Sequence, residues 1–170
     1  MREAGGLDGC TQQVRWVLSS RHYAPVSIII KFFVAPDHAA AAAVVEVGPD
    51  DFFESLTFGN FDVEEALIEW ESIFTGQTFN DLVAADVPEV VADPGDGEGP
   101  VVLAASRALQ DALTVAEEQR LVEVSRLWVA ERSADGEVLD EGIAVWILTG
   151  LAGLVRAIGR KPEGLYCWTA

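Results

Sequence analysis

Apolar residues recur at helical spacing most regularly in the segment that follows Asp62. Six of them fall within about 120° of a helical wheel and form one stripe, made of Val63, Ala66, Leu67, Trp70, Ile73 and Phe74. Asp62 and Glu65 have the spacing of a capping box, and Gly76 suits the left-handed residue that closes a helix. The pattern therefore predicts a helix over residues 63–75 whose stripe faces the core.

Four segments have the composition or the alternation of β-strands. Residues 27–34 are β-branched or aromatic almost throughout, which is typical of a central strand buried on both faces. Residues 52–58 alternate between two faces, and residues 101–104 form a short apolar run. Residues 165–169 are aromatic enough to form a last strand, which we expect beside the first.

Capping residues mark further helices between these strands. Asp37 precedes an alanine-rich run that Gly48 and the following proline stop. Ser106 begins a second helix. Thr114 stands at capping-box spacing from Glu117, so we expect the chain to break there and to form a third helix that runs to about residue 132.

The final predicted helix, residues 141–158, is apolar on nearly every side and follows the capping residue Asp140. Its uncharged run, residues 143–155, is shorter than the roughly 20 residues that span a bilayer. The helix is therefore expected either to be buried centrally or to present one face to a twin subunit.

These elements predict an α+β fold with a small mixed sheet of about four strands covered by about five helices. Residues 25–170 are expected to form a single domain. Residues 1–24 show no hydrophobic period and are expected to be an extension, with a short helical turn over residues 12–18. Residues 92–100 are dense in Gly, Pro and acidic residues and predict an exposed loop.

The charge is the unusual property of the composition, since 28 acidic and 11 basic residues leave a net charge of −17. Such a charge steers cationic partners toward the protein and argues against nucleic acid, whose binding needs clustered Lys and Arg. A compositional bias toward acidic residues would explain the same number. Cys10 and Cys167 are too few for a disulfide framework, which favours a cytoplasmic location without membrane attachment.

A search for catalytic motifs is negative. No phosphate-binding glycine loop, nucleophile elbow or zinc-binding helix motif is present, and the histidines, His22 and His38, stand apart in sequence. The sequence therefore predicts neither a metal nor a cofactor. It favours a protein without catalytic activity, and an enzyme is the alternative hypothesis.

Paired carboxylates are the one chemical feature present in excess. Asp50, Asp51 and Glu54 lead into the second predicted strand, whereas Glu64 and Glu71 share a flank of the predicted helix 63–75, outside its apolar stripe. All five are candidate binding residues for a basic partner, and a plain solvated surface is the alternative. Both interpretations require the acidic groups to stay in water.

Three residues are candidates for a pocket between the sheet and its helices. Lys31 lies inside an otherwise apolar strand, so its amine must reach the surface or find a carboxylate, for which Glu54 is the candidate. Tyr166 and Trp168 share one face of the last strand, with Cys167 on the other. Aromatic residues so placed either line a ligand site or pack a core.

Three hypotheses of function follow. The leading one is a non-enzymatic interaction protein, in the style of an immunity or inhibitor protein, that binds a basic partner through its acidic surface. The alternative is a small-molecule-binding protein or enzyme with a pocket near the candidate residues. A homo-oligomer built on the last helix is a further possibility.

Overall fold

The computed structural model describes residues 28–95, 99–159 and 161–170. The expected extension, residues 1–24, lies outside the described residues, together with the short helical turn expected within it. Ser27, where the first strand was expected to begin, and residues 96–98 of the expected acidic loop also lie outside them.

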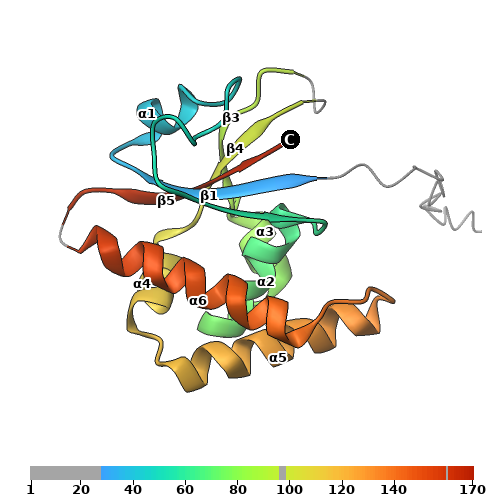
Figure 1. The fold of residues 1–170 in the computed structure, drawn as a ribbon. Helices are drawn as coiled ribbons and strands as arrows, with labels where there is room; N and C mark the ends of the chain where they lie inside the picture. Colours follow the sequence, from blue (N-terminus) through green and yellow to red (C-terminus); the bar gives the residue numbers. More distant parts are fainter. Residues whose placement is uncertain (1–27, 96–98, 160) are drawn as a thin grey trace, which may run out of the picture.

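The strands form one five-stranded sheet in the order β2-β1-β5-β4-β3, antiparallel throughout (Figure 1). Their bounds are β1 Ile29–Ala35, β2 Ser55–Gly59, β3 Glu89–Ala92, β4 Val101–Ala104 and β5 Gly164–Thr169. The α+β class and the pairing of the last strand with the first are as predicted. The sheet is antiparallel rather than mixed, and it has one strand more than expected, because β3 pairs with β4 at its far edge.

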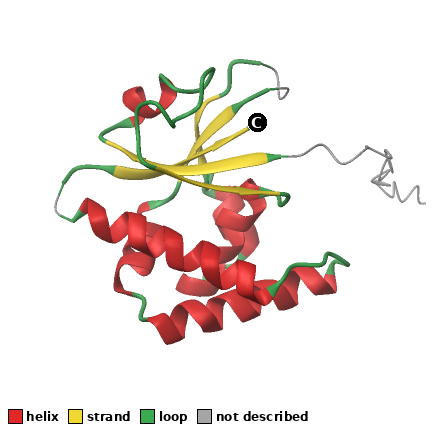
Figure 2. Ribbon diagram, in the orientation of Figure 1, coloured by secondary structure: helices red, strands yellow, loops and turns green. Residues whose placement is uncertain are grey.

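Six helices accompany the sheet in the described residues. Their bounds are α1 His38–Ala42, α2 Val63–Thr75, α3 Phe79–Ala84, α4 Arg107–Val115, α5 Glu118–Ala134 and α6 Glu141–Ile158. Figure 2 shows the longer helices layered beneath one face of the sheet, with the single turn of α1 on the other face. The molecule is thus thick on one side of the sheet and thin on the other.

The chain breaks between α4 and α5 as predicted, but the capping box expected from Thr114 to Glu117 is wrong, because Glu117 makes no side-chain cap bond and the Thr114 hydroxyl donates to the carbonyl of Gln110. Four other helices begin at the capping side chains predicted for them. Asp37, Asp62, Ser106 and Asp140 each accept a hydrogen bond from the backbone N–H three residues later, at 2.8–3.0 Å. Each bond satisfies one of the free donors of a first helical turn. Gly76 ends α2 in the left-handed conformation, with φ of 76°. These five predictions are confirmed.

The main core lies between the sheet and the helical layer. It includes the α2 stripe, of which Val63, Ala66, Leu67 and Trp70 are buried and Ile73 and Phe74 are partly buried. The indoles of Trp70 and Trp128 meet edge to face, with ring centroids 5.0 Å apart. The predicted orientation of helix 63–75 is therefore confirmed.

A second, smaller core lies on the opposite face of the sheet. Phe33, Tyr166 and Val102 point to this face and pack against α1 and the turns that follow it. Cys167 points to the main core instead, as the alternation of β5 predicts. Among the residues that the structure describes, a short helix and turns cover this face, so clefts can form at its ends.

Helix α6 is half buried rather than sealed in the core. One side of it packs into the main core, whereas Ile143 is 50% and Trp146 60% exposed on the other. By length and composition alone, α6 is the one helix among the described residues that could cross a membrane. The packed inner face of α6 contributes to the main core, which is one of the two roles expected for this helix.

Candidate functional site

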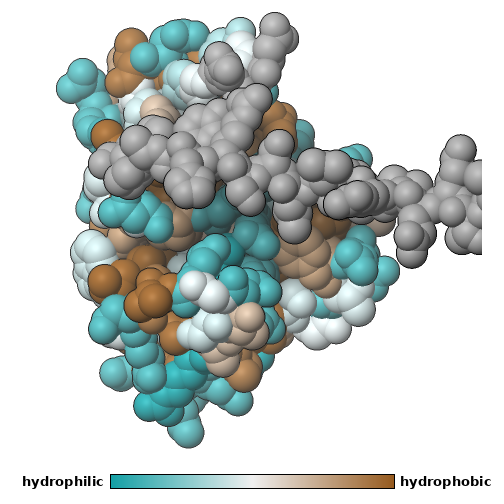
Figure 3. Space-filling model, turned by 90° about the vertical axis from the view of Figure 1, so that its right-hand side faces the viewer, coloured by the Kyte–Doolittle hydropathy of each residue, from teal (hydrophilic) through white to brown (hydrophobic). Residues whose placement is uncertain are grey.

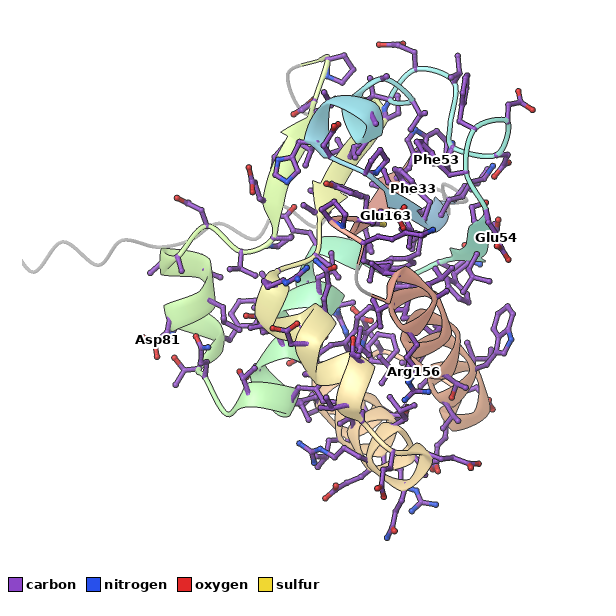
Figure 4. The ribbon with its side chains drawn as sticks, turned by 90° about the vertical axis from the view of Figure 1, so that its left-hand side faces the viewer. Phe33, Phe53, Glu54, Asp81, Arg156 and Glu163 are labelled. Carbon is purple, nitrogen blue, oxygen red and sulfur yellow. The ribbon has the colours of Figure 1, made fainter. Side chains whose placement is uncertain are left out.

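The main candidate site is a cleft of about 850 Å³ at one end of the sheet, on the side of the smaller core. Four segments far apart in sequence meet around it: the start of α1, the turn that enters β3, the start of α4 and the turn that enters β5. Glu163, in the last of these turns, is labelled in Figure 4. The cleft therefore depends on the assembled fold.

Tyr166 lines the cleft and is 4% exposed. Its ring stacks on Phe33 with centroids 5.8 Å apart and meets the ring of His38 edge to face at 5.6 Å. A Cβ atom at Gly164 would lie 3.3 Å from the Tyr166 hydroxyl oxygen, so the absent side chain leaves room for the phenol. That hydroxyl makes no hydrogen bond with any described residue, which leaves it free for a ligand.

Four carboxylates line the cleft around Tyr166: Asp37, Asp86, Glu89 and Glu163. Burial raises the pKa of the Tyr166 phenol, and the negative charges of Asp37 and Glu89 raise it further. The negative charges of these two carboxylates are therefore close enough to the phenol to interact with it electrostatically.

The cationic side chains of the cleft are fewer than its carboxylates. The Nδ1 atom of His38 lies 3.5 Å from a carboxylate oxygen of Glu89. Arg107 is an exposed residue whose Nε lies 3.7 Å from Asp111 on the same helix. The cleft consequently keeps a negative excess.

Buried hydrogen bonds hold the walls of the cleft in place. The side chain of Gln110 donates to the carbonyl of Ala105 at 2.9 Å and accepts from the backbone N–H of Leu165 at 3.1 Å. This one amide therefore joins the end of β4 and the first turn of α4 to β5. Ser106 caps α4 and donates its hydroxyl proton to the buried carboxylate of Glu71. The site is a preformed concavity rather than a gap between loose loops.

The structure separates the three predicted pocket residues. Lys31 and Trp168 are paired across β1 and β5, and the amine lies 5.6 Å from the indole centroid. The indole nitrogen of Trp168 donates to the carbonyl of Val45 at 2.8 Å. Neither residue lines the cleft, whereas Tyr166 does.

The prediction that Lys31 pairs with Glu54 is wrong. The amine donates instead to Asp50, which also accepts from the Ser55 hydroxyl at 2.7 Å. The hydrogen bond from Lys31, followed by that from Ser55, lowers the pKa of Asp50. The chain turns back at Pro49, whose carbonyl accepts from Phe52 and Phe53, and this turn gives Asp50 the position expected for Glu54.

The predicted carboxylate pair on α2 is also divided. Glu64 is exposed, but Glu71 is buried against Ser106, so the expectation that both lie in water is wrong for Glu71. The wheel places Glu71 outside the apolar stripe correctly, yet α4 packs against that flank of the helix. Packing between helices decided its burial.

Glu69, on the opposite flank of α2, is buried as well. It accepts from the indole nitrogen of Trp128 at 2.8 Å and lies 3.0 Å from the guanidinium of Arg132. Arg132 is 2% exposed and also contacts Glu65 at 2.7 Å and Glu137 at 3.4 Å. Burial raises the pKa of Glu69, although the hydrogen bond from Trp128 and the charge of Arg132 oppose it. These contacts give the buried carboxylate a structural role.

The surroundings of Cys167 and Tyr166 disfavour the anionic forms of both side chains. Burial raises the pKa of the Cys167 thiol well above its ordinary value, which opposes formation of the nucleophilic thiolate. The raised pKa of Tyr166 keeps its phenol neutral. Within the described ranges, no three His, Cys, Asp or Glu side chains are placed to hold a metal ion.

Sequence reasoning missed most residues of the cleft, including Asp37, Asp86, Glu89 and Glu163. Asp37 was identified only as a helix cap. Asp86 lies in the turn before β3, Glu89 begins that strand, and Glu163 lies in the turn before β5. Only the meeting of these distant segments makes the carboxylates neighbours. Comparison with family models, curated proteins and solved structures finds no match.

Proposed function

We propose that this chain is a non-enzymatic interaction protein that binds a basic segment of a protein partner in the acidic cleft in front of Tyr166. The observation that carries the proposal is the combination of four carboxylates with a buried phenol whose hydroxyl has no described partner. A lysine or arginine head entering the cleft would meet carboxylates and donate a hydrogen bond to that hydroxyl.

The charge of the whole chain supports a basic partner. A net charge of −17 attracts cations over distances of about a Debye length, roughly 10 Å at 0.1 M salt. Such steering raises the association rate, whereas the preformed cleft provides a place for specific contacts. A cytoplasmic location stays part of the proposal, supported by the sparse cysteines of the sequence.

A tetralysine peptide is the probe that tests the cleft. In the full-length protein at 20 mM salt, NMR shifts of backbone amides are expected to change most at residues 85–87, 89, 104–107 and 163–166. Glu89→Gln with Asp86→Asn removes two negative charges from the cleft, so it should weaken binding about tenfold, or by about 1.4 kcal/mol.

The matched control removes the same charge elsewhere. Asp51→Asn with Glu54→Gln neutralises two exposed carboxylates outside the cleft, and it should weaken binding less than twofold. Equal losses of tetralysine affinity in both double variants would show that net charge alone causes the effect. That result would contradict binding in the cleft. A larger loss in the control would move the site to the carboxylates that precede β2.

A small organic cation is a second candidate ligand, because the Tyr166 hydroxyl, which has no partner among the described residues, lines an open cleft whose volume of about 850 Å³ would admit a small molecule. Spermidine is a suitable probe. Stabilisation of the protein by spermidine that Tyr166→Phe abolishes, together with no shifts on adding tetralysine, would favour the small molecule over a protein segment.

A further inference from the structure

The outward side of α6 and the adjoining edge of β2 form an apolar surface, which we name the α6–β2 face. Its members are Leu56, Phe58, Ile143, Trp146 and Gly150. The exposed ring of Trp146 meets the edge of Phe58 at a centroid distance of 4.8 Å. Gly150 brings α6 so close to β2 that a Cβ there would lie 2.9 Å from a methyl carbon of Leu56.

This face is uncharged in a strongly acidic molecule. No acidic or basic residue occurs between Gly142 and Val155. Outward positions beside Trp146 are small, namely Gly142, Thr149 and Gly153, so a partner can approach the helix closely. Seen from the side at which β1 begins, Figure 3 shows brown, apolar side chains at the surface among the polar ones.

The described chain enters the fold beside this face. The carbonyl of Ile28 accepts a hydrogen bond from Asn60 at the end of β2. Two residues later, Ile30 pairs with Phe58, which itself contacts Trp146. Whatever precedes Ile28 is therefore tethered next to the α6–β2 face.

The tethered segment, residues 1–27, has a composition that complements the face. It contains the apolar run Val14, Trp16, Val17 and Leu18 with Arg15 inside it and Arg21 after it. Its three arginines against Glu3 and Asp8 give a charge of +1, and the remaining 8 basic and 26 acidic residues give −18. The segment is therefore slightly basic, and the strongly acidic remainder of the chain attracts it.

We propose that residues 14–18 of this chain bind the α6–β2 face, with Trp16 against Trp146. The nine residues 19–27 can span at most about 30 Å, which suffices for a face that adjoins the point of entry. A short tether holds such a segment at an effective concentration of the order of millimolar, so even weak contacts keep it bound most of the time.

Hydroxyl-radical footprinting of the full-length protein, read by mass spectrometry at single residues, tests the proposal. Trp146 is expected to be oxidised slowly in spite of its exposure within the folded domain. Trp16→Glu should raise the oxidation rate of Trp146 about fivefold, because the tethered segment then leaves the face. Gln13→Glu, which adds the same charge without removing an apolar group, should change it less than twofold.

Phe52 is the internal reference, since it is 63% exposed on a turn away from this face. Its oxidation should be equal in all three proteins, and slow oxidation of buried Trp70 confirms that each is folded. Trp146 oxidised as fast in the wild type as in Trp16→Glu would overturn the proposal. Protection that strengthens with protein concentration would assign the face to a second copy of the chain instead, and protection unaffected by Trp16→Glu would assign it to another segment.

Discussion

At the scale of single residues, the most consequential contact is the ion pair of Arg132 with Glu69. Both side chains are buried, and an arginine so placed is retained because its removal leaves a carboxylate without a countercharge. The same guanidinium reaches Glu65 on α2 and Glu137 after α5. One side chain therefore ties α5 to α2 and closes the turn that follows α5.

We expect Arg132→Met to lower the free energy of unfolding by about 3–5 kcal/mol, because Glu69 would remain buried and unpaired. Urea unfolding followed by circular dichroism measures the change. Arg107→Gln is the control, since its pair with Asp111 is exposed and should contribute less than about 1 kcal/mol. Restoration of stability by Glu69→Gln in the Arg132→Met background would confirm that the unpaired charge is the cause, and no restoration would contradict it.

Asp50 gives a prediction for pH. Its pKa in the folded protein is lowered by Lys31 and Ser55, so the pair stabilises the fold above the ordinary aspartate pKa of about 3.9. That contribution is lost as the pH falls through the lowered value. NMR titration of the Asp50 carboxyl carbon should show Lys31→Met raising its pKa more than Ser55→Ala does. A larger effect of Ser55→Ala would mean that the hydroxyl, not the amine, is the main partner.

At the scale of elements, features that depend on residues close in sequence could be predicted, whereas features that depend on contacts between distant segments could not. Helix starts follow from one side chain and a backbone N–H three residues away, so Asp62 and Ser106 were recognised from the sequence. Strand β3 was missed because Glu89–Ala92 is short and follows a turn, and its hydrogen bonds come from β4. Burial of Glu71 was missed because it depends on the position of α4.

The candidate site was less predictable than the fold for the same reason. Tyr166 was recognised because alternation along β5 is local. Its neighbours Asp37 and Glu89 lie on segments about 130 and 77 positions away in sequence, and neither carries a motif. Only the antiparallel register of the sheet brings these segments to one end. A cleft assembled from turns leaves no pattern in the sequence to read.

Two glycines of α6 give a matched test of how this helix packs. A Cβ at Gly153 meets nothing within 4 Å, so Gly153→Ala should stabilise the protein by about 1 kcal/mol through helix propensity alone. Gly150→Ala gains the same propensity but presses on Leu56, so we expect a smaller gain or a loss in thermal unfolding. Leu56→Ala removes the obstructing methyl group, and in that background the two alanines should become equivalent. Persistent inequality there would mean that another contact limits Gly150.

At the scale of the whole molecule, the acidic charge opposes the fold that carries it. Carboxylates gather both on the surface and around the cleft, and few basic residues balance them. A protein of this kind repels itself when compact, and the repulsion is the counterpart of its attraction for cations. Salt weakens both the self-repulsion and the attraction for cations. Weaker self-repulsion should stabilise the fold, whereas weaker attraction should reduce binding, so one change of salt tests both.

Raising sodium chloride from 10 to 150 mM shortens the Debye length from about 30 to about 8 Å. Screening of self-repulsion should then raise the Tm by a few degrees, since about 1 kcal/mol corresponds to roughly 2–4 °C in a chain of this size. Over the same range tetralysine should bind more weakly, because screening also removes its attraction to the cleft. Asp51→Asn with Glu54→Gln changes the net charge only from −17 to −15 (−17 + 2), so it should reduce the rise in Tm slightly and leave the loss of binding nearly unchanged. A fall in Tm would show instead that exposed ion pairs, such as that of Arg107 with Asp111, outweigh repulsion, because salt screens attraction at the surface but hardly affects buried pairs.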